Sequence, residues 1–106
     1  MDDYQDFVVS TKRYDREYAV IYPALGLASE AGEVAGKVKK IIRDAAGQVD
    51  LEQANKIIAE LGDVIWYATC LADDLGFTLE EVIECNVAKL LGRVERDTIQ
   101  GSGDER

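Results

Sequence analysis

Two nearly identical acidic motifs, each with two carboxylates three residues apart, constrain this chain more than any other feature. Glu30 and Glu33 form the first pair, and Glu60 and Asp63 form the second. Both pairs lie in stretches with helical apolar periodicity, where residues three apart are neighbours on one face. Like charges in one site repel, so four carboxylates can converge only around a cation. A hard divalent metal, which prefers oxygen ligands, is the natural candidate.

The apolar pattern predicts an all-α chain with a four-helix bundle-like fold. We expect helices over residues 2–13, 23–43, 51–75 and 79–97. Pro23 suits the first turn of a helix, Asp50 suits an N-cap, and Gly76 suits a helix C-terminus. Thr78 and Glu81 form a capping box. Residues 1–97 are therefore expected to form one helical domain, followed by a flexible C-terminal tail over residues 98–106.

On a helical wheel, Glu30 and Glu60 fall in line with apolar residues, while Glu33 and Asp63 stand at the edge of the stripe. A lone carboxylate in such a position is costly. Antiparallel packing of the two helices would bring both acid pairs to one end of a shared groove. The alternative is a solvated helix face, on which lysines at i, i+4 pair with these acids. The pairs would be Lys37 with Glu33 and Lys56 with Glu60.

Composition excludes several classes of function. The chain has 106 residues, 21 of them acidic and 12 basic, and its net charge of −9 argues against duplex nucleic acid as a partner. The absence of histidine excludes catalysis by Ser-His-Asp or Cys-His groups. Two isolated cysteines indicate free thiols in a reducing cytoplasm. The sequence shows neither a signal peptide nor an apolar run long enough to span a membrane.

The predicted fourth helix carries three further polar side chains beside its apolar line. Asn86 can extend a metal shell or bind a phosphate oxygen. Lys89 and Arg93 offer positive charge to a polyphosphate. The alternative is a polar flank with ordinary surface bases.

These residues resemble the MazG-like nucleoside triphosphate pyrophosphohydrolases of the all-α pyrophosphatase superfamily. The resemblance covers about residues 20–97. It rests on the doubled acidic motif, on the Gly26-Leu27 pair before it, and on the three residues of the fourth helix. It implies a catalytic domain that hydrolyses a (deoxy)nucleoside triphosphate to the monophosphate and pyrophosphate.

The resemblance also assigns roles to individual residues. Glu30, Glu33, Glu60 and Asp63 would hold Mg²⁺, with Mn²⁺ as a possible substitute. Glu33 would orient or deprotonate the attacking water, and Lys89 and Arg93 would stabilise charge on the polyphosphate. The residues expected to contact substrate are Asn86, Lys89, Arg93 and Lys37.

Assembly is expected because one short helical chain offers few partners to its aromatic residues. Trp66, Tyr14, Tyr18 and Tyr22 would be left exposed on a monomer. Small members of the resembled family form dimers or tetramers, so we expect a homo-oligomer, a tetramer before a dimer. Trp66 and Tyr67 are also candidates for stacking on a base, although a subunit contact is the simpler role for Trp66.

Two other classes compete with this interpretation. A di-iron carboxylate bundle also places acids on several helices, but it typically requires Glu-x-x-His motifs, and this chain has no histidine. A non-catalytic acidic helical module for protein interaction is the second alternative.

Overall fold

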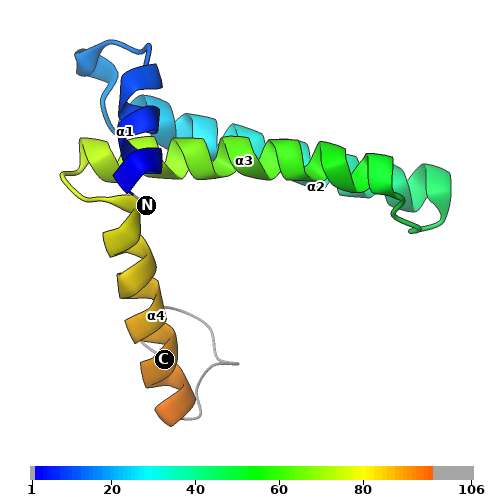
Figure 1. Cartoon of the computed structure of the whole chain (residues 1–106). Helices are drawn as coiled ribbons and strands as arrows, with labels where there is room; N and C mark the ends of the chain where they lie inside the picture. The colour runs from blue at the N-terminus through cyan, green and yellow to red at the C-terminus, as the bar shows by residue number, and fades with distance from the viewer. Residues whose placement is uncertain (1, 97–106) are drawn as a thin grey trace.

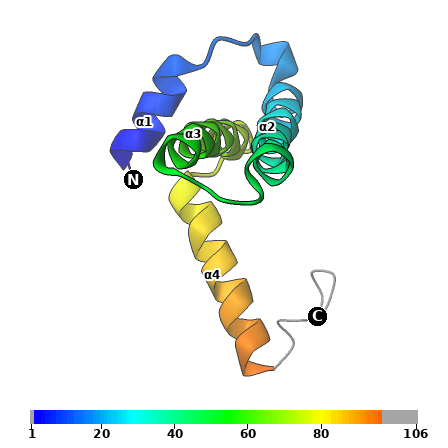
Figure 2. The same ribbon diagram turned by 90° about the vertical axis from the view of Figure 1, so that its right-hand side faces the viewer.

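The computed structural model describes residues 2–96, and no strand occurs among them. Four α-helices and one 3₁₀ helix make up this part of the chain (Figures 1 and 2). They are α1 (Asp2–Thr11), η1 (Arg16–Tyr18), α2 (Ile21–Ala45), α3 (Leu51–Asp74) and α4 (Leu79–Glu95). The prediction of an all-α chain with four helices is confirmed. The predicted tail at 98–106 lies outside the described residues.

Helices α2 and α3 form a long antiparallel hairpin and run side by side over most of their length (Figures 1 and 2). Asp50 begins α3 as predicted, because its carboxylate accepts the Gln53 backbone N–H at 2.8 Å and its own N–H donates to the Gln53 side chain at 3.0 Å. Gly47, at φ 79°, provides the left-handed turn of the connecting loop. The hairpin provides the two facing surfaces on which the acidic pairs lie.

The start of α2 differs from its prediction. The helix begins at Ile21, two residues before Pro23, and Pro23 is buried within its first turn. Val20 precedes it at a positive φ of 70°, and its carbonyl accepts the Ala24 N–H at 3.1 Å. A positive φ is unusual for a β-branched residue, so the surrounding structure must hold Val20 there.

Asp74, at the C-terminal end of α3, holds the segment that joins α1 to α2. Its carboxylate accepts hydrogen bonds from Lys12 Nζ at 2.7 Å, the Tyr14 hydroxyl at 2.8 Å and the Val20 backbone N–H at 2.9 Å. Lys12 also pairs with Asp73 at 2.6 Å. We call Asp74 and its three partners the Asp74 clasp. The clasp fixes the point at which α2 begins.

Helix α1 crosses the C-terminal part of α3 and packs against it there (Figure 1). The buried residues of this contact include Val8 on α1 and Thr69 and Cys70 on α3. Trp66 is half-buried, and its indole N–H donates to the Thr11 hydroxyl at 2.8 Å. Trp66 therefore has a partner within the chain, contrary to the expectation that it would lack one.

Helix α4 leaves the hairpin at a steep angle and extends away from it (Figures 1 and 2). Its start is fixed by the predicted capping box, in which Thr78 Oγ1 accepts the Glu81 N–H at 3.1 Å. Beyond that start α4 leaves apolar side chains exposed, including Leu91 at 58% and Val94 at 60%. The described chain by itself therefore does not close all four helices into one compact bundle.

No helix within residues 2–96 has the length and apolar character that crossing a bilayer requires. Both cysteines are free thiols, with Cys70 buried and Cys85 exposed.

Candidate active site

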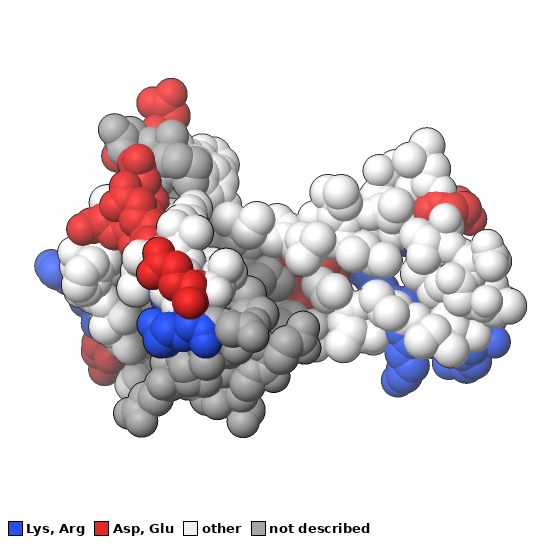
Figure 3. Space-filling model, turned by 90° about the horizontal axis from the view of Figure 1, so that it is seen from below, with Lys and Arg blue, Asp and Glu red and all other residues white. Residues whose placement is uncertain are grey.

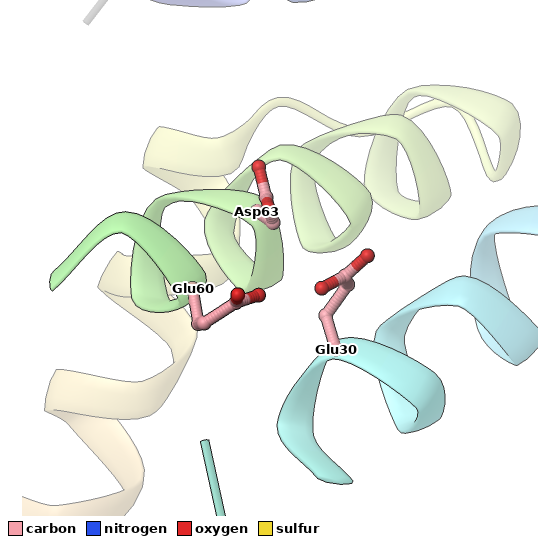
Figure 4. A group of neighbouring side chains, drawn as sticks. All are labelled: Glu30, Glu60 and Asp63. Atoms are coloured by element: carbon pink, nitrogen blue, oxygen red, sulfur yellow. The ribbon is translucent and has the colours of Figure 1, made fainter. Parts of the chain in front are cut away.

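Three carboxylates from the two arms of the hairpin converge on one point. Glu30 comes from α2, and Glu60 and Asp63 come from α3. One oxygen of each lies within 4.8 Å of the others. Figure 4 shows Glu30 reaching across the gap between the helices toward both acids of α3. Glu30 and Glu60 are half-buried and Asp63 is exposed, so the group opens to solvent on one side. We call these residues the acidic triad.

The triad lies along the middle of the hairpin, since none of its members is in a terminal turn of its helix. The expectation that the acid pairs would meet at one end of the groove is therefore wrong. The expectation of antiparallel packing holds, and it is this packing that lets the i, i+3 pair of α3 face Glu30.

The neighbouring carboxylates change the ionisation of Glu30. A hydrogen bond with Glu60 raises the pKa of Glu30, and so do its partial desolvation and the negative charges of Asp63, Glu60 and Glu33. A carboxyl in this position retains its proton more readily than an isolated one. A divalent cation can take the place of that proton and satisfy the same oxygens.

The donor set fits a hard metal ion. All three ligating groups are carboxylates, the oxygen donors that Mg²⁺ and Mn²⁺ prefer. Mg²⁺ usually binds one or two carboxylates and keeps several waters, so the open side at Asp63 suits it. The triad can therefore hold a divalent cation that is also open to a ligand.

The fourth acid of the doubled motif, Glu33, is exposed and is not part of the triad. It lies one turn after Glu30 on α2. Lys37 does not pair with Glu33, as the solvated-face alternative expected, but crosses to Glu60 at 3.4 Å. Lys56 pairs with Glu52 at 3.4 Å instead of Glu60. The acids of the doubled motif thus interact with residues of the opposite helix of the hairpin. A helical wheel of one helix alone cannot show such contacts.

An aromatic group borders the triad on the side away from the hairpin loop. Tyr67 lies one turn beyond Asp63, and its ring packs so closely on Gly26 of α2 that a Cβ there would overlap it. Burial raises the pKa of Tyr67, and the neighbouring Tyr22, Glu30 and Asp63 raise it further. The Tyr22 and Tyr67 ring centroids are 6.3 Å apart. Gly26 is therefore the residue that lets Tyr67 settle beside the acids.

Only an indirect signal in the sequence pointed to the contact between Gly26 and Tyr67. Gly26 stood out as part of the motif that carries the resemblance, but nothing local linked it to Tyr67. The roles of the two candidate stacking residues also separate in the structure. Trp66 turns to α1, whereas Tyr67 lies next to the triad.

The polar residues of α4 are not brought to the triad within one chain. Asn86 and Lys89 are exposed and Arg93 is buried, and all three lie on the helix that extends away from the hairpin (Figure 1). Asn86 and Lys89 line an open hollow with Phe77, Val82 and Cys85. Their predicted roles toward substrate remain predictions.

Comparison with known proteins gives the family. Residues 23–96 match the MazG nucleotide pyrophosphohydrolase domain. The chain therefore belongs to the MazG family of nucleotide pyrophosphohydrolases, and the acidic triad lies inside the matched region.

Two relatives resemble the chain over most of its length. It is 49% identical over 85 residues to the Gene 37 protein of Mycobacterium phage L5, an alignment that covers 80% of this chain and 75% of the relative. It is 37% identical over 89 residues to the uncharacterized protein YvdC of Bacillus subtilis strain 168, covering 79% and 84% respectively. No solved structure matches the chain significantly.

Proposed function

We propose that this protein hydrolyses a (deoxy)nucleoside triphosphate to the monophosphate and pyrophosphate, with Mg²⁺ as the physiological metal and Mn²⁺ as a substitute. The observation that carries the proposal is the convergence of Glu30, Glu60 and Asp63 from two helices within 4.8 Å. Membership of the MazG family supports the reaction class.

The residues of the triad would hold the metal, and each has a distinct setting. Glu30 and Glu60 are half-buried and would anchor the ion, while the exposed Asp63 would lie on the side that receives substrate. A bound divalent ion would neutralise phosphate charge and lower the pKa of a bound water.

Glu33 is our candidate for the group that orients or deprotonates the attacking water. It is exposed, follows Glu30 by one turn and is outside the triad, so its carboxylate can serve as a base without being a ligand. The water oxygen would bond to the α-phosphorus and its proton would pass to Glu33. The bond from the α-phosphorus to the bridging oxygen would break, and pyrophosphate would leave with the electron pair. Glu33 as a fourth ligand is the alternative, and the two roles can be separated by experiment.

We further propose that the active form is a homo-oligomer, a tetramer or a dimer. This proposal is supported by α4, which extends away from the hairpin (Figure 2). Several of its apolar side chains are exposed, among them Val87, Leu91 and Val94. Large apolar side chains are also exposed on the hairpin, such as Leu25 at 67% and Ile58 at 64%. A second copy that covers these surfaces would also bring an α4 to a neighbouring hairpin. The exposed Asn86 and Lys89 would then act on substrate from that helix.

A cytoplasmic location follows from the same proposal, since nucleoside triphosphates are cytoplasmic and both thiols are free.

The test is a panel of ribo- and deoxyribonucleoside triphosphates assayed for pyrophosphate release, with Mg²⁺ and with excess chelator. The proposal predicts release from at least one triphosphate that stops in chelator and returns with Mg²⁺ or Mn²⁺. Thermal unfolding should shift upward with Mg²⁺, because the ion binds only the folded triad. Absence of both pyrophosphate release and the thermal shift would favour the non-catalytic interaction module. Light scattering over a dilution series tests assembly, and an active monomer at the lowest assayable concentration would rule it out.

A further inference from the structure

A cavity lined by lysines lies in the same groove as the acidic triad, on the side of the hairpin loop. Its volume is ≈ 260 Å³, and it lies between the distal parts of α2 and α3. The residues that line it are Lys37, Lys40, Ile41, Asp44, Gln53 and Lys56. We call Lys37, Lys40 and Lys56, which come from both arms of the hairpin, the lysine pocket.

The lysine pocket is continuous with the triad. Lys37 follows Glu30 by two turns of α2, and Lys56 precedes Glu60 by one turn of α3. Because the two helices are antiparallel, both displacements point toward the loop. The Nζ of Lys37, itself a lining residue, lies 3.4 Å from Glu60. A ligand that reaches the triad on this side therefore meets the lysines next.

The charge of the cavity is positive despite the presence of Asp44. The Arg43 guanidinium donates to both carboxylate oxygens of Asp44, at 2.7 Å each. Arg43, and more weakly Lys40, lower the pKa of Asp44. In Figure 3 the blue side chains of the hairpin gather near its loop end, whereas most red ones lie around α4 and its neighbours.

Lysines near the end of α2 also interact favourably with the helix dipole, and that effect alone would explain exposed lysines on α2. It does not explain Lys56, which lies in α3 and faces the same cavity. The ion pair of Lys56 with Glu52 is an exposed contact at 3.4 Å, of a kind that contributes little. A concave site with three ammonium groups from two helices is instead suited to a polyanion.

The opposite side of the triad has the opposite character. Tyr67, packed on Gly26, and Tyr22 lie toward the open end of the hairpin. The groove thus runs from aromatic residues, through carboxylates, to ammonium groups. This order matches a molecule with an aromatic base at one end, a metal-bound phosphate in the middle and a polyphosphate tail at the other end.

We propose that the lysine pocket binds the β- and γ-phosphates of the substrate and holds the pyrophosphate product, with the base directed toward Tyr67. This orientation rests on the proposed function, but the pocket itself can be tested without turnover. The lysine pocket adds Lys40 and Lys56 to Lys37 as residues that contact the substrate. No residue of α4 takes part in this contact.

The experiment measures the binding of inorganic pyrophosphate by calorimetry, in Mg²⁺ and separately in chelator. Lys40→Gln is compared with Lys39→Gln, which removes the same charge from the adjacent exposed position outside the cavity. Loss of one charge-assisted contact should weaken pyrophosphate binding by about tenfold in Lys40→Gln. The Lys39→Gln protein should bind within about twofold of wild type, because an exposed charge outside the cavity contributes little. Binding of a deoxynucleoside monophosphate should be equal in all three proteins.

Equal weakening of pyrophosphate binding by both substitutions would show a general charge effect and would overturn the proposal that the lysine pocket binds pyrophosphate. So would the absence of pyrophosphate binding to wild type. Weaker binding of the monophosphate in Lys40→Gln would overturn the orientation. If no triphosphate is hydrolysed but Lys40→Gln alone weakens pyrophosphate binding, the proposed function fails and the pocket stands.

Discussion

Replacing Asp74 with alanine should strongly destabilise the junction of α1, α2 and α3. The Asp74 side chain is only 7% exposed and accepts hydrogen bonds from Lys12, Tyr14 and the Val20 N–H. All three donors bond to an ionised carboxylate; single hydrogen bonds to a charged group contribute about 1.5–3 kcal/mol each, and bonds that share one acceptor are not additive. The substitution also leaves the Val20 N–H without its acceptor and releases a residue held at positive φ. Removing one partner of a largely buried ion pair costs about 3–5 kcal/mol, and we expect a loss of this size in the free energy of unfolding.

Asp73→Ala is the matched control. Asp73 occupies the adjacent position, is 35% exposed and shares only the ammonium of Lys12. Its loss should cost less than about 1 kcal/mol, as for other partly exposed ion pairs. Urea unfolding followed by Trp66 fluorescence measures both variants, at one protein concentration because assembly would shift the midpoint.

The pH dependence of the free energy of unfolding provides a second test of the Asp74 clasp. Burial of Asp74 opposes its ionisation, but hydrogen bonds from Lys12, Val20 and Tyr14 outweigh burial and lower its pKa. A lowered carboxyl pKa stabilises the folded state above the unfolded value of about 3.9, and this stabilisation is lost as the pH falls through the folded value. The stability gap between wild type and Asp74→Ala should therefore be full at pH 7 and shrink below about pH 4. A gap equal to that of Asp73→Ala, or one unchanged by acid, would refute the role of the clasp.

Three further predictions concern the site. Glu30→Gln should raise stability in chelator at neutral pH, because it removes repulsion among the carboxylates. It should also abolish the Mg²⁺-induced thermal shift, because it removes a metal ligand. Stability of the metal-free wild type should rise as the pH falls through the raised pKa of Glu30. Glu33→Gln should lower turnover at least about 100-fold yet keep the thermal shift, if Glu33 is a base and not a ligand; loss of the shift would make it a ligand. Gly26→Ala should destabilise the protein by about 1 kcal/mol, because the added Cβ would overlap Tyr67. Gly36→Ala, with open space around it, should stabilise the protein by about 0.5–1 kcal/mol. If urea unfolding shows that both substitutions change the free energy of unfolding in the same direction, the packing of Tyr67 on Gly26 is contradicted.

Local signals were the part of the fold that could be predicted. Asp50, Thr78 and Gly76 mark helix ends through interactions within a few residues, and each acts in the structure as expected. The convergence of acids from two helices was also predictable, since it follows from apolar periodicity and antiparallel packing. The same reasoning gave the wrong position along the groove, because the register of two helices depends on side chains that face each other.

Features set by distant contacts were missed. The start of α2 depends on Val20, which is held by a carboxylate 54 residues later in the chain. The pairing of Lys37 with Glu60 crosses the hairpin, so i, i+4 spacing could not predict it. The direction of α4 is not encoded in its own amphipathic pattern, which shows that one face is apolar but not what covers it.

Phosphorus NMR of the reaction products shows which phosphorus atom of the substrate the enzyme attacks. Wild type and Asp63→Asn are each incubated with Mg²⁺ and a nucleoside triphosphate that the wild-type protein hydrolyses. The products are identified as they form. We predict monophosphate and pyrophosphate in equal amounts from wild type, and a rate lowered by orders of magnitude in Asp63→Asn with the fold intact. Diphosphate and orthophosphate as the main products, or an unchanged rate in Asp63→Asn, would contradict a metal-dependent pyrophosphohydrolase built on the acidic triad.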